Sequence, residues 1–229
     1  MNTALLLLAF AAGDPIPKES DEARIKREWG ELVDQGGKTA IKLIDDKLKM
    51  TIPAGNRIAA INTNLKSDFA PYVYKTMQGD FVAKVTVYRH SAPDNATANL
   101  REFITSSGLI AIFKDGTVLT FCRYHHPSNS ENQFRSDMRS PFSSMSTSGG
   151  HAVPAKQDSI QIRMTRSGDL MDLDYSFDNG KKWSKFTTQK RLTKDQVKIG
   201  IFAEHSCDAI TEAIFSQFEI KTIDMVEKK

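Results

Sequence analysis

Two aspartates, Asp172 and Asp174, stand two residues apart in a run, residues 170–177, that alternates apolar and polar side chains. In a β-strand this spacing places both carboxylates on one face. Arg163 lies in a second alternating run, residues 160–166, within cross-strand reach of such carboxylates. Guanidinium and carboxylate groups on one face can hydrogen-bond the hydroxyls of a polar ligand, and a carboxylate pair can also act as acid and base.

These two runs predict a hairpin in which Ser167 and Gly168 form a two-residue loop and Arg166 stands opposite Asp169. A one-residue slip would set apolar residues against charged ones, so the alternation specifies the register. The expected partners on the apolar face and then on the polar face are Met164/Met171, Ile162/Leu173 and Ile160/Tyr175, followed by Arg163/Asp172 and Gln161/Asp174.

Four more polar residues lie near the ends of two other predicted strands. Arg123 and His125 alternate at the end of the strand that begins at Val118, and Glu204 and His205 follow strand 197–203. If the polar face of the hairpin is concave, these residues border the same groove. The expected ligand-binding set is Arg123, His125, Arg163, Asp172, Asp174, Glu204 and His205. The competing interpretation is a set of ordinary solvated surface charges.

Other catalytic chemistry has little support in the sequence. None of the five histidines shows the H-x-x-x-H or H-E-x-x-H spacing of a zinc site, and G-x-S-x-G is absent. We therefore expect no metal and no cofactor. Cys122 and Cys207 are either a disulfide or two buried thiols, and both interpretations stay open.

The alternating runs predict an all-β chain. The motif SDEARIKREW at residues 20–29 has an N-cap serine, acids in the first turn and i,i+4 charge pairs, which indicates one short helix. Short strands with turns between them and no βαβ unit favour a two-sheet antiparallel sandwich. The expected strands cover residues 47–52, 81–87, 109–113, 118–124, 160–166, 170–177, 197–203 and 215–220.

Residues 125–159 interrupt this pattern with eight serines between Ser128 and Ser148 and with Gly149-Gly150. We interpret the segment as a long loop insertion. Loops of this length are typical either of binding elements or of mobile insertions.

Composition excludes several classes of protein. The 229 residues carry a net charge of +3, far from the basic excess of a duplex-binding protein, and 40% of them are hydrophobic. No apolar run approaches the roughly 18 residues of a membrane-spanning helix. We expect neither a nucleic-acid partner nor a membrane span.

The N-terminal residues 4–12, ALLLLAFAA, have the length and composition of a secretory h-region, and Ala9-Phe10-Ala11 has the small-x-small cleavage pattern. We therefore expect a signal peptide at 1–12, a linker and short helix at 13–27, a sandwich at 28–222 and a charged tail at 223–229. A buried N-terminal strand or helix is the alternative interpretation of residues 4–12.

Residues 176–183, SFDNGKKW, match S-x-D-x-G-x-x-W, the Asp-box of sialidases and other β-proteins. The motif predicts a tight turn in which Asp178 accepts backbone hydrogen bonds, Gly180 takes a positive φ and Trp183 packs beneath. We interpret it as a folding element.

Taken with Gly79-Asp80-Phe81, Gly108-Leu109, residues 200–203 and Phe215-x-x-Phe218, this motif resembles the concanavalin A-like lectin/glucanase superfamily. The most similar branch is one of bacterial sandwich domains of unknown function, sometimes labelled regulation-of-enolase-like. The resemblance covers residues 28–222 and implies a jelly-roll sandwich whose concave sheet faces a carbohydrate. The E-x-D-x-E run of the glucanase branch is absent.

We therefore expect a secreted or periplasmic, lectin-like, non-catalytic domain whose partner is a glycan or polysaccharide. The alternative is a glycoside hydrolase with Asp172, Asp174 or Glu204 as acid and base. A structural or protein-interaction role is a third hypothesis.

Export has a direct test. Protein purified from its native cells should begin near Ala12 when its N-terminus is sequenced, because signal peptidase cleaves after small residues. Cytosolic protein that keeps Met1 would contradict the export hypothesis.

Overall fold

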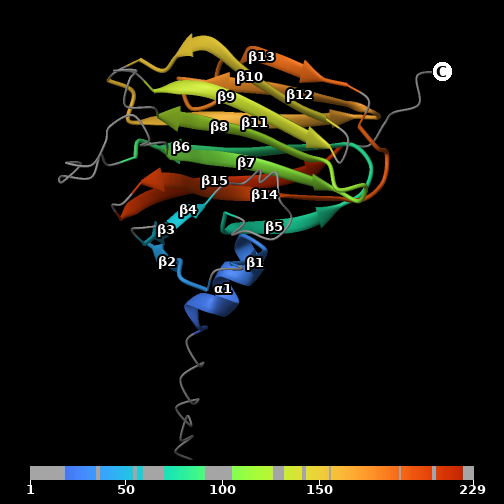
Figure 1. Ribbon diagram of the computed structural model, residues 1–229. Helices are drawn as coiled ribbons and strands as arrows, with labels where there is room; N and C mark the ends of the chain where they lie inside the picture. The colour runs from blue at the N-terminus through green and yellow to red at the C-terminus, as the bar shows by residue number, and fades with distance from the viewer. Residues whose placement is uncertain are drawn as a thin grey trace, which may run out of the picture.

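The chain forms two packed antiparallel sheets and one short helix (Figure 1). The computed structural model describes residues 19–34, 37–53, 56–58, 70–90, 105–125, 132–140, 143–154, 156–190, 192–207 and 210–223. The two sheets and the helix confirm the predicted all-β sandwich with an N-terminal helix.

Its elements are α1 (Asp21–Glu28), β1 (Glu31–Val33), β2 (Ala40–Ile44), β3 (Lys47–Ile52), β4 (Asn56–Ile58), β5 (Tyr72–Met77), β6 (Phe81–Tyr88), β7 (Thr105–Phe113), β8 (Val118–His125), β9 (Gln133–Ser140), β10 (Ser143–Ala152), β11 (Ser159–Ser167), β12 (Leu170–Ser176), β13 (Ser184–Gln189), β14 (Val197–Cys207) and β15 (Thr211–Thr222).

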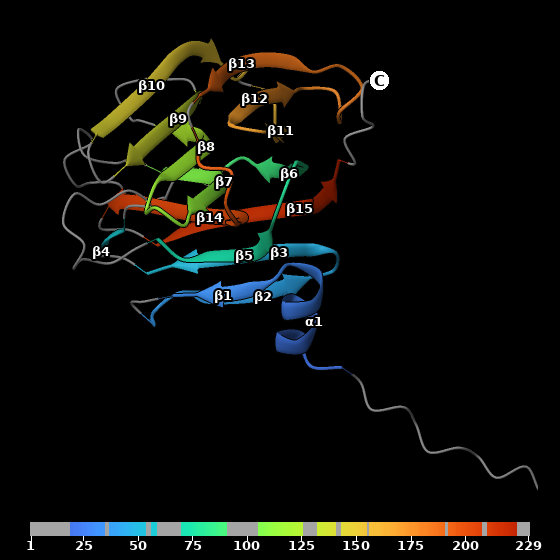
Figure 2. The same cartoon turned by 90° about the vertical axis from the view of Figure 1, so that its right-hand side faces the viewer.

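One sheet has eight strands in the order β1-β5-β14-β7-β8-β9-β10, with β4 also paired to β14. The other has seven strands in the order β13-β12-β11-β6-β15-β3-β2. Figures 1 and 2 both place α1 at the end of the sandwich where β1 and β2 lie, far from β10 and β13. In the described part of the chain, no helix is long and apolar enough to cross a membrane.

Side chains alternate between the interior of the sandwich and its two outer faces. Leu48, Met50 and Ile52 of β3 are completely buried, and the alternating residues of β6 behave in the same way. From the eight-stranded sheet, Phe121 reaches across to Phe186 of β13, with ring centroids 5.1 Å apart. This contact shows that the odd-numbered residues of β8 point inward.

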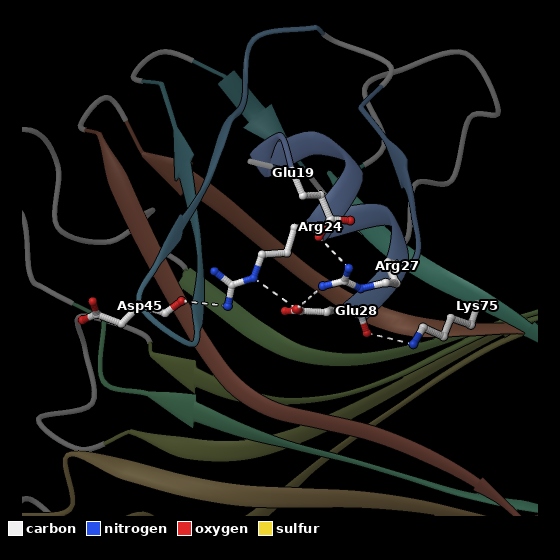
Figure 3. A network of polar contacts seen from close by, with 6 residues as sticks. All are labelled: Glu19, Arg24, Arg27, Glu28, Asp45 and Lys75. Atoms are coloured by element: carbon white, nitrogen blue, oxygen red, sulfur yellow. Dashed lines mark hydrogen bonds and ion pairs between the residues drawn. The ribbon is translucent and has the colours of Figure 1, made fainter. Parts of the chain in front are cut away.

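Helix α1 lies beside β1 and β2 (Figure 2), and Figure 3 shows the polar contacts that hold it there. Ser20 caps it by accepting a hydrogen bond from the Ala23 N–H, as the sequence predicts. Arg24 pairs with Glu28 and also donates to the carbonyl of Asp45, in the turn between β2 and β3. Lys75 of β5 donates to the carbonyl of Glu28. The helix is therefore tied to the β2–β3 turn of one sheet and to β5 of the other.

Two arginines are buried in the sandwich and bind backbone carbonyls instead of carboxylates. Arg166 of β11 is 1% exposed and donates to the carbonyls of Thr193 and Asp195, at 2.7 and 2.9 Å. Arg123 of β8, also 1% exposed, donates to the carbonyls at positions 157 and 158, at 2.9 and 3.1 Å. Each arginine thus donates hydrogen bonds to carbonyls in a segment between strands, where no neighbouring strand pairs with them.

The interpretation of residues 125–159 as a long loop is wrong. Most of that segment forms the antiparallel pair β9 and β10, which extends the eight-stranded sheet beyond β8. Six of its serines, from Ser136 to Ser148, lie on these paired strands, and Phe134 of β9 is completely buried. Polar composition obscured an alternation that is present in residues 133–139.

The predicted hairpin is present, but its register differs by two residues. Ser167 pairs with Leu170, so the loop consists of Gly168 and Asp169. Gly168 has a φ of 62°, as the first position of a type II′ turn requires, and its N–H donates to the Asp80 carboxylate at 2.8 Å. A shift of two keeps every side chain on its predicted face but sets Arg163 opposite Asp174.

Cys122 is a buried free thiol. The proposed signal peptide and residues 224–229 of the tail lie outside the described residues, as does the Cys207 side chain.

Replacement of Arg166 by methionine should lower the free energy of unfolding by about 3 kcal/mol, because two buried carbonyls lose charged donors. Urea denaturation measures this loss. Arg27→Met, on the exposed side of α1, is the matched control and should leave the midpoint unchanged. Equal effects of the two substitutions would contradict the role assigned to Arg166.

Candidate functional site: the outer face of the eight-stranded sheet

The sequence-predicted site residues lie in three separate places. Arg123 and His205 are buried inside the sandwich. His125 lies two residues beyond Arg123 on β8, on the same inner side of the sheet, and is the strand-register partner of Thr105. Glu204 is on the outer side of the eight-stranded sheet, because its neighbours Ala203 and His205 are both buried in the interior. Arg163, Asp172 and Asp174 are on the outer side of the seven-stranded sheet. The structure therefore does not bring the seven residues into one groove.

The inward-facing residues belong to a polar cluster within one end of the sandwich. His90 Nε2 lies 2.6 Å from Ser107 Oγ, and His90 Nδ1 lies 3.3 Å from Thr105 Oγ1. His205 Nδ1 bonds Thr211 Oγ1 at 2.9 Å, across the two sheets. Burial, and then the charge of nearby Arg123, lowers the pKa of His90 to about 3. Burial and two hydroxyl contacts hold His90 in place and neutral, which is the behaviour of a structural residue.

On the outer side of the seven-stranded sheet, the predicted ligand groups bind one another. The Arg163 guanidinium donates twice to Asp174, at 2.9 and 3.1 Å, and lies 4.1 Å from the Trp183 ring centre. Hydrogen bonds from Lys185 and Thr188 lower the pKa of Asp172. A paired carboxylate with a lowered pKa is a poor general acid, and Asp172 is such a group.

The Asp-box is a folding element, as its turn chemistry predicts. Asp178 accepts hydrogen bonds from the Ser176 hydroxyl and the Lys182 N–H, both at 2.8 Å, and Gly180 has a φ of 80°. A Cβ at Gly180 would come within 2.5 Å of Gln161 Oε1. The turn is therefore packed closely against β11.

The second outer surface combines aromatic rings with charged groups. We call it the eight-strand face and define it by side chains on the outer side of β5, β14, β7, β8 and β9. Across the strands these side chains form three rows: Arg139-Val118-Ile112-Lys198-Thr76, Asp137-Thr120-Ile110-Gly200-Tyr74 and Arg135-Cys122-Gly108-Phe202-Tyr72, with Tyr124, Ser106 and Glu204 beyond them.

Two glycines lie in the centre of the eight-strand face, beside the buried side chains of Ile110 and Phe202. A Cβ at Gly108 would come within 2.2 Å of the Phe121 carbonyl oxygen, and one at Gly200 within 1.9 Å of the Val73 carbonyl oxygen. Only glycine fits at these two positions on adjacent strands. Both glycines are buried, so the backbones of adjacent strands pack closely at these two positions.

Tyrosines and cations flank this centre on both sides. Lys198 Nζ lies 4.7 Å from the Tyr74 ring centre, and the Arg135 guanidinium lies 4.9 Å from that of Tyr124. Arg135 also pairs with Asp137 at 2.7 Å. Rings and hydrogen-bonding groups side by side are what a sugar requires, because it presents both C–H and hydroxyl groups.

The sequence analysis missed Arg135, Asp137 and Arg139 because they fell in the segment interpreted as a loop. The signal was present, since they alternate with Phe134, Ser136 and Met138, of which Phe134 is completely buried. An amphipathic strand over residues 133–139 could have been predicted from that alternation.

Carboxylates on the eight-strand face are too far apart for a glycosidase pair. Glu204 and Asp137 are three strands and four residues apart, which puts their Cα atoms roughly 20 Å from each other. Such pairs stand about 5 to 9.5 Å apart in most glycosidases. Burial also raises the pKa of the Cys122 thiol well above its usual range, so it is no nucleophile. No cluster of three metal-binding side chains occurs among the residues that the structure describes.

Known structures share this fold at very low sequence identity. A functionally unknown protein from Saccharomyces cerevisiae matches 85% of this chain and 96% of its own, with a TM-score of 0.64 and 13% identity. A legume lectin-like domain from Entamoeba histolytica matches 96% and 100%, with a TM-score of 0.56 and 8% identity. The alginate lyase from Klebsiella pneumoniae matches 80% of this chain and 84% of its own, with a TM-score of 0.51 and 7% identity. No family model and no curated protein sequence matches the chain.

The neutral state of His90 predicts a pH-dependent stability. An unfolded histidine titrates near pH 6.5, so between about pH 3 and 6.5 the unfolded chain binds the extra proton and stability falls as the pH is lowered. From pH 7 to pH 5 this group should cost about 2 kcal/mol. Urea unfolding at the two pH values should show a smaller loss for His90→Gln. An identical loss in both proteins would contradict the assignment.

The similarity to the yeast protein, the alginate lyase and the legume lectin-like domain shows that the chain has the concanavalin A-like lectin/glucanase sandwich fold.

Proposed function

We propose that the protein is a secreted or periplasmic lectin-like domain that binds a glycan on the eight-strand face and does not cleave it. The observation that carries this proposal is the side-by-side arrangement of Tyr74, Tyr124 and charged groups around Gly108 and Gly200. It places aromatic rings beside hydrogen-bonding groups on one side of the sheet.

Two neighbours of the same fold support a saccharide ligand by their names, since one is a legume lectin-like domain and another an alginate lyase. The alternative, a glycoside hydrolase, is less well supported. Asp172 and Asp174, on the outer side of the seven-stranded sheet, are paired with cations, and Glu204 and Asp137 are far apart. Glycan binding through Arg163 and Asp174 stays a competing prediction.

A glycan array followed by calorimetry tests the proposal and separates the two faces. Glu204→Gln and Tyr74→Ala should each weaken binding of the best array ligand about tenfold or more, the loss expected for a hydrogen bond to a charged group or for a stacking ring. Asp174→Asn, on the opposite face, should bind like the parent protein. Melting temperatures exclude unfolding as the cause.

Reducing-sugar release is assayed on the same ligand, and the proposal predicts none. Release that is lost in Asp172→Asn or Glu204→Gln would contradict the non-catalytic assignment. Loss of binding in Asp174→Asn alone would move the site to the seven-stranded sheet.

A further inference from the structure

We propose that the ligand of the eight-strand face is an acidic polysaccharide, whose anionic groups bind Arg139 and Lys198. This inference rests on the proposed function and specifies the chemical class of its ligand.

Arg139 is a half-buried cation that has no anionic partner among the residues that the structure describes. It lies near the end of β9, on the same side of the strand as Arg135 and Asp137. Asp137 is already engaged by Arg135, at 2.7 Å. The Arg139 Nη1 atom is shielded from solvent and has no hydrogen-bond partner. A shielded guanidinium nitrogen without an acceptor loses hydration and gains nothing in return, unless a ligand supplies the acceptor.

Lys198 is a second cation in the same row across the strands. The row runs from Arg139 through Val118 and Ile112 to Lys198, so the two cations are three strands apart, with Cα atoms at roughly 14 Å. Lys198 contacts the Tyr74 ring and makes no ion pair in the described part of the chain. Glu204 is six residues away along β14, so it does not neutralise this row.

Between the two cations lie Val118 and Ile112, both half-buried. Sugar rings can rest their C–H faces on these two side chains while their acidic groups reach a cation at either end. A polysaccharide that lies across the strands would contact Arg139, then the apolar pair and then Lys198. A guanidinium binds planar carboxylates through two parallel hydrogen bonds, which makes Arg139 the more selective of the two contacts.

The opposite face shows that unpartnered cations are not the rule in this protein. There five cations contact carboxylates, in the pairs Lys49–Glu212, Lys84–Glu219, Lys221–Glu219, Arg163–Asp174 and Lys185–Asp172. The excess of positive charge in the Arg139 row is therefore a local feature of the eight-strand face.

Calorimetry with three polymers tests the inference: a polyuronate such as alginate, a sulfated dextran and unmodified dextran. The full chain should bind the polyuronate, and this binding should weaken as salt is raised, because the contact is ionic. Arg139→Gln should weaken polyuronate binding about tenfold or more. Arg163→Gln, the same substitution on the opposite face, should leave it unchanged.

Each result has a defined consequence. Binding of sulfated dextran that also depends on Arg139 supports an acidic ligand and identifies its group as sulfate. Equal binding of both anionic polymers by the parent protein and Arg139→Gln overturns the inference, because it indicates unspecific charge attraction. If only neutral glycans bind and Glu204→Gln abolishes that binding, the acidic class is wrong while the proposed function stands. No glycan binding at all on the array overturns both.

Discussion

The contact between Phe121 and Phe186 across the interior determines which residues of β8 lie on the inner side of the sheet and which lie on its outer side. Residues paired across neighbouring strands lie on the same side of the sheet. The inward and outward positions of β8 therefore fix those of β7, β9 and β14. It sends Arg123 inward, where the guanidinium binds backbone carbonyls, and it sends Cys122 and Tyr124 outward. The composition of the eight-strand face is thus a consequence of interior packing.

Much of the fold could be predicted because alternation is a strong signal wherever the inward residues are apolar. The helix at Asp21–Glu28 and the strands around Leu48, Phe81 and Ile199 follow it directly. The hairpin register was wrong by two residues because that shift leaves every side chain on the same face. Only the turn, in which Gly168 needs a positive φ, distinguishes the two pairings.

The candidate site was harder to predict, for two physical reasons. Arg123 and His205 are polar, so the sequence suggested exposure, but near the end of a sandwich polar residues can be buried when carbonyls or hydroxyls satisfy them. The β9 strand has only Phe134 and Met138 as apolar inward residues, with Ser136 between them, and its serine-rich surroundings suggested a loop. Arg135, Asp137 and Arg139 were therefore not assigned to a strand, and their place on the outer side of the sheet was not predicted.

The two outer faces differ in how their charges are balanced. On the seven-stranded sheet, Arg163 and Asp174 satisfy each other and Trp183 covers the guanidinium. On the eight-stranded sheet, Arg139 has no such partner among the residues that the structure describes. A ligand gains more by supplying a missing partner than by displacing one already present.

Hydrogen exchange read by mass spectrometry, with and without a saturating glycan, tests the location of the site most directly. The account predicts that the glycan slows exchange in peptides from β8, β9 and β14 and leaves β11 and β12 unchanged. Protection confined to β11, β12 and the Asp-box turn would contradict it.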